Sequence, residues 1–377
     1  MTQTATASDE EIKIDLITLQ GVQNYGSVLQ ALATQSLFEE LGANVTVIDY
    51  VKAPNRYENL ARTWGDGNPI KSLAMLPTIN RWKSVFRLFN EKHLHLTDKT
   101  YTTAEDFAGY YSNADAYCTG SDQVWNSVWN RGILPELYLS FAPDDAYRFA
   151  FSASFGQSRL SDEEVSQTKA YIDKYSRISV REDSGLSILE EQYGYQGAAQ
   201  TVDPTLCMPP DFWRGYTSER LIDDGYILIY NLNRSKEFDD YAVALAKKVG
   251  LKLVRLCTRY DQFYRPGKSV LVPTIYEFIN LIDNATCVLT DSFHASAFAM
   301  NMGTEPICIY PHEFGGRLAS FLKLVHSEQR HAKGFDDFDV INRHVDFDGV
   351  RDVLDSERKK ARHFLSSTFD DIRRQRG

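Results

Sequence analysis

The segment Thr290-Asp-Ser-Phe-His294 carries side chains suited to proton transfer and anion binding. It stands between an apolar run and a helical pattern over Ala295–Met302, so His294 is expected at a helix N-terminus. A neutral imidazole there can act as a general base, and the hydroxyl of Ser292 can donate to a phosphate. A capping or core histidine is the alternative; the polar neighbours Asp291 and Ser292 favour a functional site.

The segment Gly120-Ser-Asp-Gln-Val-Trp-Asn126 follows another apolar run and offers a carboxylate. Polar side chains at the carboxyl ends of parallel strands are where α/β proteins place their sites. Asp122 is therefore a candidate acid or base and Ser121 a candidate substrate-binding residue, with helix capping an equally open interpretation. Trp125 and Trp129 stand four residues apart, a spacing that favours packing over binding.

Two further segments could bind an anion. Gly21-Val-Gln-Asn-Tyr-Gly26 joins a strand to a helix, and backbone N–H groups at a helix start bind anions. Its spacing is neither GxGxxG nor a P-loop, so a tight turn without a ligand stays open. Arg181, in Ser179-Val-Arg-Glu-Asp-Ser-Gly185, could clamp a carboxylate or phosphate; an ion pair with Glu182 or Asp183 is the alternative.

The sequence shows no arrangement typical of a metal site. His93 and His95 could chelate a cation, but no third ligand stands at a useful spacing. The 5 cysteines are scattered, odd in number and without a CxxC pair, which is typical of free thiols in a reducing compartment. We therefore expect neither a metal nor a cofactor.

Two β–α–β units follow from the hydrophobic pattern. Each consists of an apolar strand, a helix that ends at a glycine, and a second strand; Ser27 is the predicted N-cap of the first helix. The expected elements lie at 12–19, 28–41 and 44–50 in the first unit, and at 226–230, 236–249 and 251–256 in the second.

Such units build parallel sheets with right-handed crossovers. We predict an α/β protein of two Rossmann-like, doubly wound domains, covering residues 12–200 and 201–345, with their strand ends facing a shared cleft. Residues 51–112 are predicted to form an insertion on the first domain, and residues 346–377 a C-terminal helical segment.

The composition excludes several classes of protein. With 51 acidic and 41 basic residues among 377, the formal net charge of −10 disfavours a nucleic-acid binder. No apolar run is long enough to span a membrane, and the polar, acidic residues 1–12 do not resemble a signal peptide. We expect a cytoplasmic protein.

Two basic segments leave peripheral contact with the inner face of the membrane open. Residues 81–89 interleave basic side chains with Trp82, Phe86 and Phe89, an amphipathic pattern that could meet a membrane or an acceptor. Residues 346–377 are rich in arginine and lysine and could lie on an anionic surface, although a solvated helix face is the favoured interpretation.

Six segments, taken together and in this order, resemble the polysaccharide pyruvyl transferase family over residues 13 to about 325. One departure from the family pattern is Ala295, where a glycine commonly follows the histidine. The six segments are Asn24-Tyr-Gly-Ser-Val-Leu-Gln-Ala31, Gly120-Ser-Asp-Gln-Val-Trp-Asn126, Ser152-Ala-Ser-Phe-Gly156, Val180-Arg-Glu-Asp-Ser-Gly185, Val202-Asp-Pro-Thr-Leu206 and Thr290-Asp-Ser-Phe-His294.

The resemblance implies a fold similar to the GT-B glycosyltransferases. It also implies transfer of pyruvate from phosphoenolpyruvate, as the donor substrate, onto a sugar of a surface polysaccharide precursor, commonly as a cyclic ketal. For this chemistry His294 is expected to transfer the proton, and Asp122 to contact an acceptor hydroxyl or serve as a second acid or base. The residues expected to bind substrate are Asn24, Tyr25, Gly26, Ser121, Arg181, Ser292 and, by its family position after two glycines, Arg317.

Two other functions are compatible with the same residues. One is a nucleotide-sugar glycosyltransferase on the same fold, and the other is a non-catalytic glycan- or anion-binding protein. The acceptor sugar, a lipid carrier for it and the oligomeric state all stay open at this stage.

Overall fold

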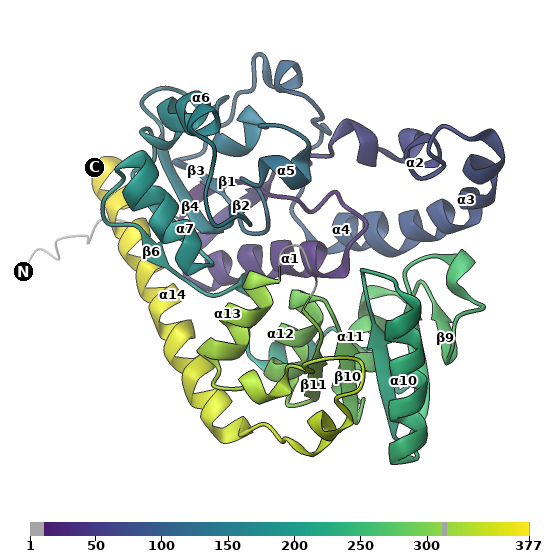
Figure 1. Cartoon of the computed structure of the whole chain (residues 1–377). Helices are drawn as coiled ribbons and strands as arrows, with labels where there is room; N and C mark the ends of the chain where they lie inside the picture. Colours follow the sequence, from purple (N-terminus) through teal and green to yellow (C-terminus); the bar gives the residue numbers. More distant parts are fainter. Residues whose placement is uncertain (1–10, 311–314, 377) are drawn as a thin grey trace, which may run out of the picture.

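The computed structural model describes residues 11–310 and 315–376, which form two parallel β-sheets (Figure 1). The first has the strand order β2-β1-β3-β4-β5-β6 and the second the order β11-β10-β7-β8-β9. The strands of the first sheet are β1 (Ile12–Ile17), β2 (Ala43–Val47), β3 (Ala116–Thr119), β4 (Tyr147–Ala153), β5 (Arg177–Val180) and β6 (Ala199–Gln200). Those of the second are β7 (Tyr226–Tyr230), β8 (Lys252–Cys257), β9 (Lys268–Leu271), β10 (Cys287–Thr290) and β11 (Glu305–Cys308).

Helices connect the strands of both sheets. In the first domain they are α1 (Tyr25–Glu40), α2 (Tyr57–Trp64), α3 (Pro69–Trp82), α4 (Leu88–His93), α5 (Ser127–Asn130), α6 (Asp162–Ile172) and α7 (Asp183–Ser187). In the second they are α8 (Pro204–Cys207), α9 (Pro210–Arg214), α10 (Lys236–Val249), α11 (Ile275–Asp283), α12 (Phe293–Met302) and α13 (Gly316–Leu324), followed by the long C-terminal α14 (Phe347–Arg376).

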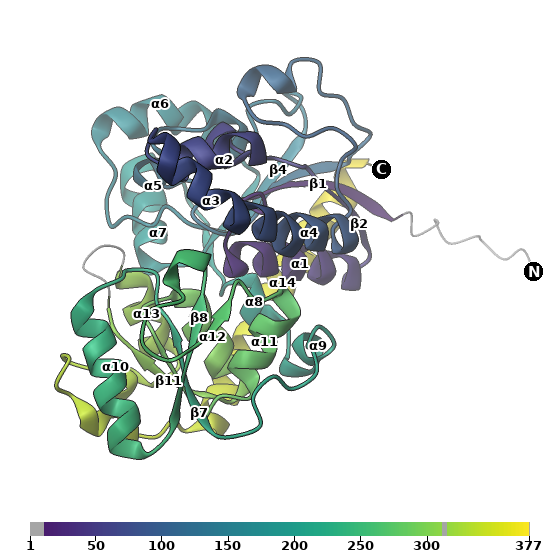
Figure 2. The ribbon, with the colours of Figure 1, turned by 90° about the vertical axis from the view of Figure 1, so that its right-hand side faces the viewer.

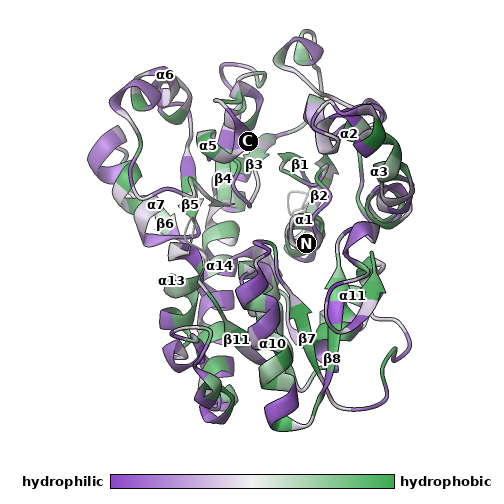
Figure 3. Cartoon of the chain, turned by 45° about the vertical axis from the view of Figure 1, so that its right-hand side comes forward, coloured by the Kyte–Doolittle hydropathy of each residue, from purple (hydrophilic) through white to green (hydrophobic). Residues whose placement is uncertain are grey.

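The predicted α/β class with two doubly wound sheets is confirmed. The strands are apolar along their length because helices cover both faces of each sheet: β4 and β7 are buried at every position, whereas α10 keeps a polar outer face (Figure 3). The predicted N-cap of α1 is wrong. Asn24, not Ser27, caps it, since its Oδ1 accepts from the N–H groups of Gly26 (2.9 Å) and Ser27 (3.3 Å).

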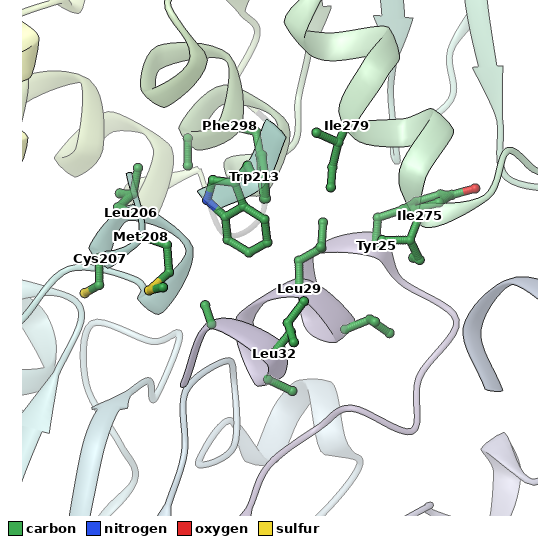
Figure 4. Packing of buried hydrophobic residues seen from close by; sticks show 14 of the residues in the cluster. Tyr25, Leu29, Leu32, Leu206, Cys207, Met208, Trp213, Ile275, Ile279 and Phe298 are labelled. Atoms are coloured by element: carbon green, nitrogen blue, oxygen red, sulfur yellow. The ribbon is translucent and has the colours of Figure 1, made fainter. Parts of the chain in front are cut away.

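Helix α1 joins the two domains into one core. It is buried on nearly every side, because it lies between the sheets and neighbours cover it all round (Figure 2). Leu29 and Leu32 of α1 share a buried cluster with Trp213 and Phe298 of the second domain (Figure 4). The N-terminus of α1 is thereby held at the interdomain boundary.

The aromatic residues of the insertion are buried, which corrects the expectation of an amphipathic outer face. Trp82, Phe86 and Phe89 are at most 4% exposed. The indole N–H of Trp82 donates to the carbonyl of Thr258 (2.8 Å), so the insertion packs against the second domain. Within the described residues, no helix combines the length and apolar character that crossing a bilayer requires.

Helix α14 runs from the second domain back to the first (Figure 1). Phe369 packs edge-on against Phe38 of α1, with ring centroids 5.6 Å apart. The basic residues of this helix form ion pairs within the chain: Arg362 pairs with Glu40 of α1 at 2.5 Å. Much of the basic character of residues 346–377 is therefore neutralised internally.

Candidate active site

Four ionisable side chains meet where the carboxyl ends of the two sheets face each other. Asp122 follows β3, Arg181 follows β5, Asp203 caps α8, and His294 lies in the first turn of α12. Arg181 Nη1 donates to Asp203 Oδ2, and Arg181 Nη2 lies 3.6 Å from Asp122 Oδ1. His294 Nε2 lies 3.6 Å from Asp203 Oδ2. The structure thus brings together three of the residues predicted from sequence, Asp122, Arg181 and His294.

Electrostatics keep this cluster charged. Burial alone would raise the pKa of Asp203, but the Arg181 guanidinium, and then His294, hold that pKa below its usual range. The same balance lowers the pKa of Asp122, where burial is outweighed by Arg181 and His294. Burial acts to lower the pKa of Arg181, yet Asp203 and Asp122 raise it. Both carboxylates are therefore ionised beside a charged guanidinium.

Asp122 is held in a strained position. Its φ is +74°, a conformation that costs a non-glycine residue about 1–3 kcal/mol and persists only where neighbours enforce it. Ser27 Oγ donates to its Oδ2 (2.5 Å), and its own Oδ1 accepts from the N–H of Gln123 (2.8 Å). One carboxylate oxygen is thus bound to α1 and the other lies toward Arg181.

Gly26 lets the imidazole of His294 approach α1. A Cβ atom on Gly26 would lie 2.1 Å from His294 Cγ, a distance that side chains do not tolerate. The N–H groups of Gly26 and Ser27 are bound by Asn24, so these two donors, expected to bind an anion, are already used. Gly26 therefore serves the site by giving room to His294.

The polar neighbours of the cluster have structural partners. Ser121 Oγ donates to the carbonyl of Ser152 (2.8 Å), and Ser292 Oγ caps α12 by accepting from Ala295 (3.4 Å). Asp291 accepts from the backbone N–H groups that follow β7. Burial raises the pKa of Asp291 although these N–H groups act to lower it.

Tyr25 joins the domains and does not point at the cluster. Its hydroxyl donates to the carbonyl of Pro273 (2.6 Å), and its ring stacks on Phe278 at 4.5 Å. Burial raises the pKa of this hydroxyl well above its usual value, so it stays protonated. The structure therefore gives Tyr25 a role in domain contact, and its contact with substrate stays a prediction.

A cavity of about 480 Å³ opens beside Arg181 and Asp203. Phe293 and Arg317 line it, and the guanidinium carbons of Arg181 and Arg317 lie 5.6 and 5.9 Å from the ring centroid of Phe293. Burial and the nearby Arg181 charge lower the pKa of Arg317, and Arg317 forms no ion pair in the part of the chain that the structure describes. Two guanidinium groups held this close favour an anion between them.

Buried polar atoms without a hydrogen-bond partner lie in this cavity and in the neighbouring charged cluster. Nε and Nη2 of Arg181, Nε of Arg317 and Nε2 of His294 are buried without a hydrogen-bond partner among the described residues. Such atoms are costly unless a ligand or water binds them. Three of these nitrogen atoms belong to Arg181 and Arg317, which line the cavity, and they suit an anionic ligand with several oxygen atoms.

Sequence reasoning assigned no role to Asp203, which is the central carboxylate of the cluster. The segment Val202-Asp-Pro-Thr-Leu206 places it before a proline, where an aspartate caps a helix, and its Oδ1 does accept from the N–H of Thr205 (3.0 Å). Its other oxygen meets Arg181 only because β5 and α8 adjoin in space. Phe293 and Ser27 were also missed, because their contacts with Arg181 and Asp122 join segments that are distant in the sequence.

Within the described residues, no three His, Cys, Asp or Glu side chains gather as metal ligands would. The 5 cysteines are all buried and unpaired, as expected.

Comparisons with known proteins agree on the fold. Among solved structures, the chain is similar to the UDP-N-acetylglucosamine 2-epimerase from Rickettsia bellii, with 12% identity, 96% of each chain covered and a TM-score of 0.52. It is also similar to the glycotransferase of kitacinnamycin, with 12% identity, 97% of this chain and 99% of that chain covered, and a TM-score of 0.50. At such identity the likeness shows the GT-B-like fold alone. No curated protein matches the chain significantly. A sequence model of polysaccharide pyruvyl transferases matches residues 24–313.

Proposed function

The chain belongs to the polysaccharide pyruvyl transferase family, and from this premise we propose that it transfers pyruvate from phosphoenolpyruvate to a sugar of a surface polysaccharide precursor, as a ketal. The observation that carries the proposal is the pair of guanidinium groups, Arg181 and Arg317, which lie 5.6 and 5.9 Å from the centroid of the Phe293 ring, next to the proton-transfer candidate His294. This arrangement suits a small dianionic molecule that must gain a proton.

The donor carries anionic groups that can accept hydrogen bonds from the unpaired nitrogen atoms of the cavity. Phosphoenolpyruvate carries a carboxylate, a phosphate and an unsaturated methylene carbon. Arg317, which has no carboxylate partner in the described structure, is assigned to the phosphate, and the free Nε and Nη2 of Arg181 to the donor carboxylate. Phe293 provides an apolar surface for the methylene group. Arg317 lies beyond the residues that the family model matches.

His294 is the proposed proton-transfer residue. As imidazolium it gives a proton to the methylene carbon, which becomes the methyl group, and the donor carbon attached to the phosphate oxygen becomes electrophilic. Two acceptor hydroxyl oxygens form bonds to that carbon and the carbon–phosphate oxygen bond breaks. One hydroxyl proton returns to His294, and the other leaves with phosphate, so the protons balance. Asp203, whose Oδ2 lies 3.6 Å from Nε2, is placed to orient the imidazole.

Asp122 is the proposed partner of the acceptor hydroxyl. Its low pKa keeps it ionised, so it serves as a hydrogen-bond acceptor that orients the hydroxyl toward the donor more than as a strong base. Ser27 fixes one oxygen of this carboxylate and thereby its direction.

Calorimetric titration of phosphoenolpyruvate into the purified protein tests the donor assignment. Wild type should bind it saturably, and Arg317→Met should weaken binding by about 30-fold or more, because losing a desolvated charge pair costs about 2 kcal/mol or more. Arg351→Met, an exposed arginine of α14, is the matched control and should bind as wild type does. Saturable binding of a nucleotide sugar with none of phosphoenolpyruvate would instead support the glycosyltransferase alternative.

A further inference from the structure

A second and larger cavity lies between the domains, and the proposed donor site does not use it. Its volume is about 1180 Å³, and it is lined by the loops after β1 and β2, by α2 and the end of α3, and by the loops after β7 and β8. It shares no lining residue with the cavity at Arg317. A cavity of this size on the reacting edge of both sheets can hold a ligand larger than the donor.

Positive charge dominates this second cavity. Four cationic residues line it, Lys52, Arg131, Arg234 and Arg259, against the single lining carboxylate of Glu136. The hydroxyl of Tyr50 already donates to that carboxylate at 2.6 Å. In a chain of net charge −10, this concentration of cations is local and attracts anions.

Three of these cations are not neutralised by the protein. Lys52, Arg131 and Arg234 form no ion pair in the described parts of the chain, whereas Arg259 pairs with Asp261. Burial, and then the charge of Arg259, lower the pKa of Arg234. Burial lowers the pKa of Lys52 to about 8, with Arg131 acting in the same direction and Asp122 against it. An anion in the cavity would relieve these repulsions.

Exposed indole rings line the same cavity. Trp129 is 39% exposed and lies under the Lys52 ammonium, 4.1 Å from Nζ to the ring centroid. Trp64 is 41% exposed and lies under the guanidinium of Arg259 at 5.6 Å. Flat aromatic faces beside charged donors suit a ring with one apolar C–H face and polar edges, which describes a pyranose.

The cavity adjoins the proposed reacting groups. Asn24 lines it and caps α1, and the residues that follow, Gly26 and Ser27, contact His294 and Asp122. The charge of Asp122 also reaches Lys52. The first turn of α1 thus connects the lining of the second cavity to Asp122 and His294.

We propose that the second cavity binds the acceptor as a sugar bearing an anionic group, a phosphate or a carboxylate, with the ring on Trp129 and the anion at Lys52, Arg131 and Arg234. The proposal rests on the proposed function for its acceptor role. Guanidinium and ammonium groups bind both kinds of anion, so the experiment separates them.

Binding is measured on the full chain by calorimetry with glucose, glucose 1-phosphate, glucuronic acid and inorganic phosphate. At least one anionic sugar should bind about tenfold more tightly than glucose, as a charge-assisted hydrogen bond predicts. Lys52→Met should remove that preference. Trp129→Leu should weaken binding of the anionic sugar without changing the affinity for inorganic phosphate. Lys247→Met, on the outer face of α10, is the matched control.

The proposal is overturned if glucose binds as tightly as both anionic sugars, or if Lys52→Met leaves their affinities unchanged. Phosphoenolpyruvate should bind the Lys52 and Trp129 variants as it binds wild type, because its cavity contains neither residue. If folded wild-type protein does not bind phosphoenolpyruvate, the proposed function is contradicted. If wild type binds phosphoenolpyruvate but does not prefer anionic sugars over glucose, only this inference is contradicted.

Discussion

Replacing Gly26 with alanine should displace the imidazole of His294. The new Cβ would lie 2.1 Å from Cγ and 2.2 Å from Nδ1 of His294, whereas unbonded carbon atoms approach to about 3.5 Å. The ring must therefore move by roughly 1 Å. A shift of that size at a reacting group can lower the rate by about 100-fold.

Two opposing terms determine the stability of Gly26→Ala. Alanine favours a helix over glycine by about 1 kcal/mol, while overpacking a buried position costs about 1–3 kcal/mol. The net loss should not exceed about 2 kcal/mol, so the variant folds. Phosphoenolpyruvate binding should persist, because the three atoms nearest the new methyl group all belong to His294, not to Arg181 or Arg317.

A double-mutant cycle isolates the contact. Turnover is measured as release of phosphate in the presence of acceptor, and stability by urea unfolding, for both single variants and the double variant with His294→Ala. Without the imidazole, Gly26→Ala should no longer destabilise the chain. The reasoning is refuted if Gly26→Ala retains full turnover, or if its stability cost is the same whether or not the imidazole is present.

Asp203→Asn should destabilise the chain by about 3 kcal/mol in urea unfolding, since it leaves the Arg181 guanidinium buried without its main partner. Because folding lowers the pKa of Asp203, the stability it supplies is present above about pH 4 and is lost as pH falls, so an acid titration of Asp203→Asn should be flatter than that of wild type. Tyr25→Phe should cost about 1 kcal/mol by leaving the Pro273 carbonyl unsatisfied, with unchanged phosphoenolpyruvate affinity by calorimetry. Affinity for an anionic sugar should fall as pH rises through about 8 in wild type and stay flat in Lys52→Met.

The sequence was sufficient to predict the two β–α–β units because their periodicity is local. Asn24 shows where this reasoning fails: both Asn24 and Ser27 can cap a helix, and only the backbone of the first turn decides between them. Trp82, Phe86 and Phe89 look amphipathic when the insertion is considered alone. Their burial depends on the second domain, whose loops are distant in sequence.

Three residues of the cluster were named from the sequence, and the structure brings them together. His294, Asp122 and Arg181 each follow a strand, and the carboxyl edge of a parallel sheet brings such residues together. Asp203 and the second cavity were not predicted, because a salt bridge between β5 and α8 and a space between domains have no local signal. The contact of the Tyr25 hydroxyl with Pro273 also has no local signal, because Pro273 lies in the other domain.

Transfer of label from [14C]phosphoenolpyruvate tests the central claim most directly. The purified chain is incubated with the labelled donor and a panel of sugars, sugar phosphates and uronic acids. The amount of acid-labile label in the sugar fraction is then compared with the amount of inorganic phosphate released. The account predicts equal amounts of both in wild type and neither with His294→Asn. Phosphate release without labelled sugar, or undiminished transfer by His294→Asn, would contradict it.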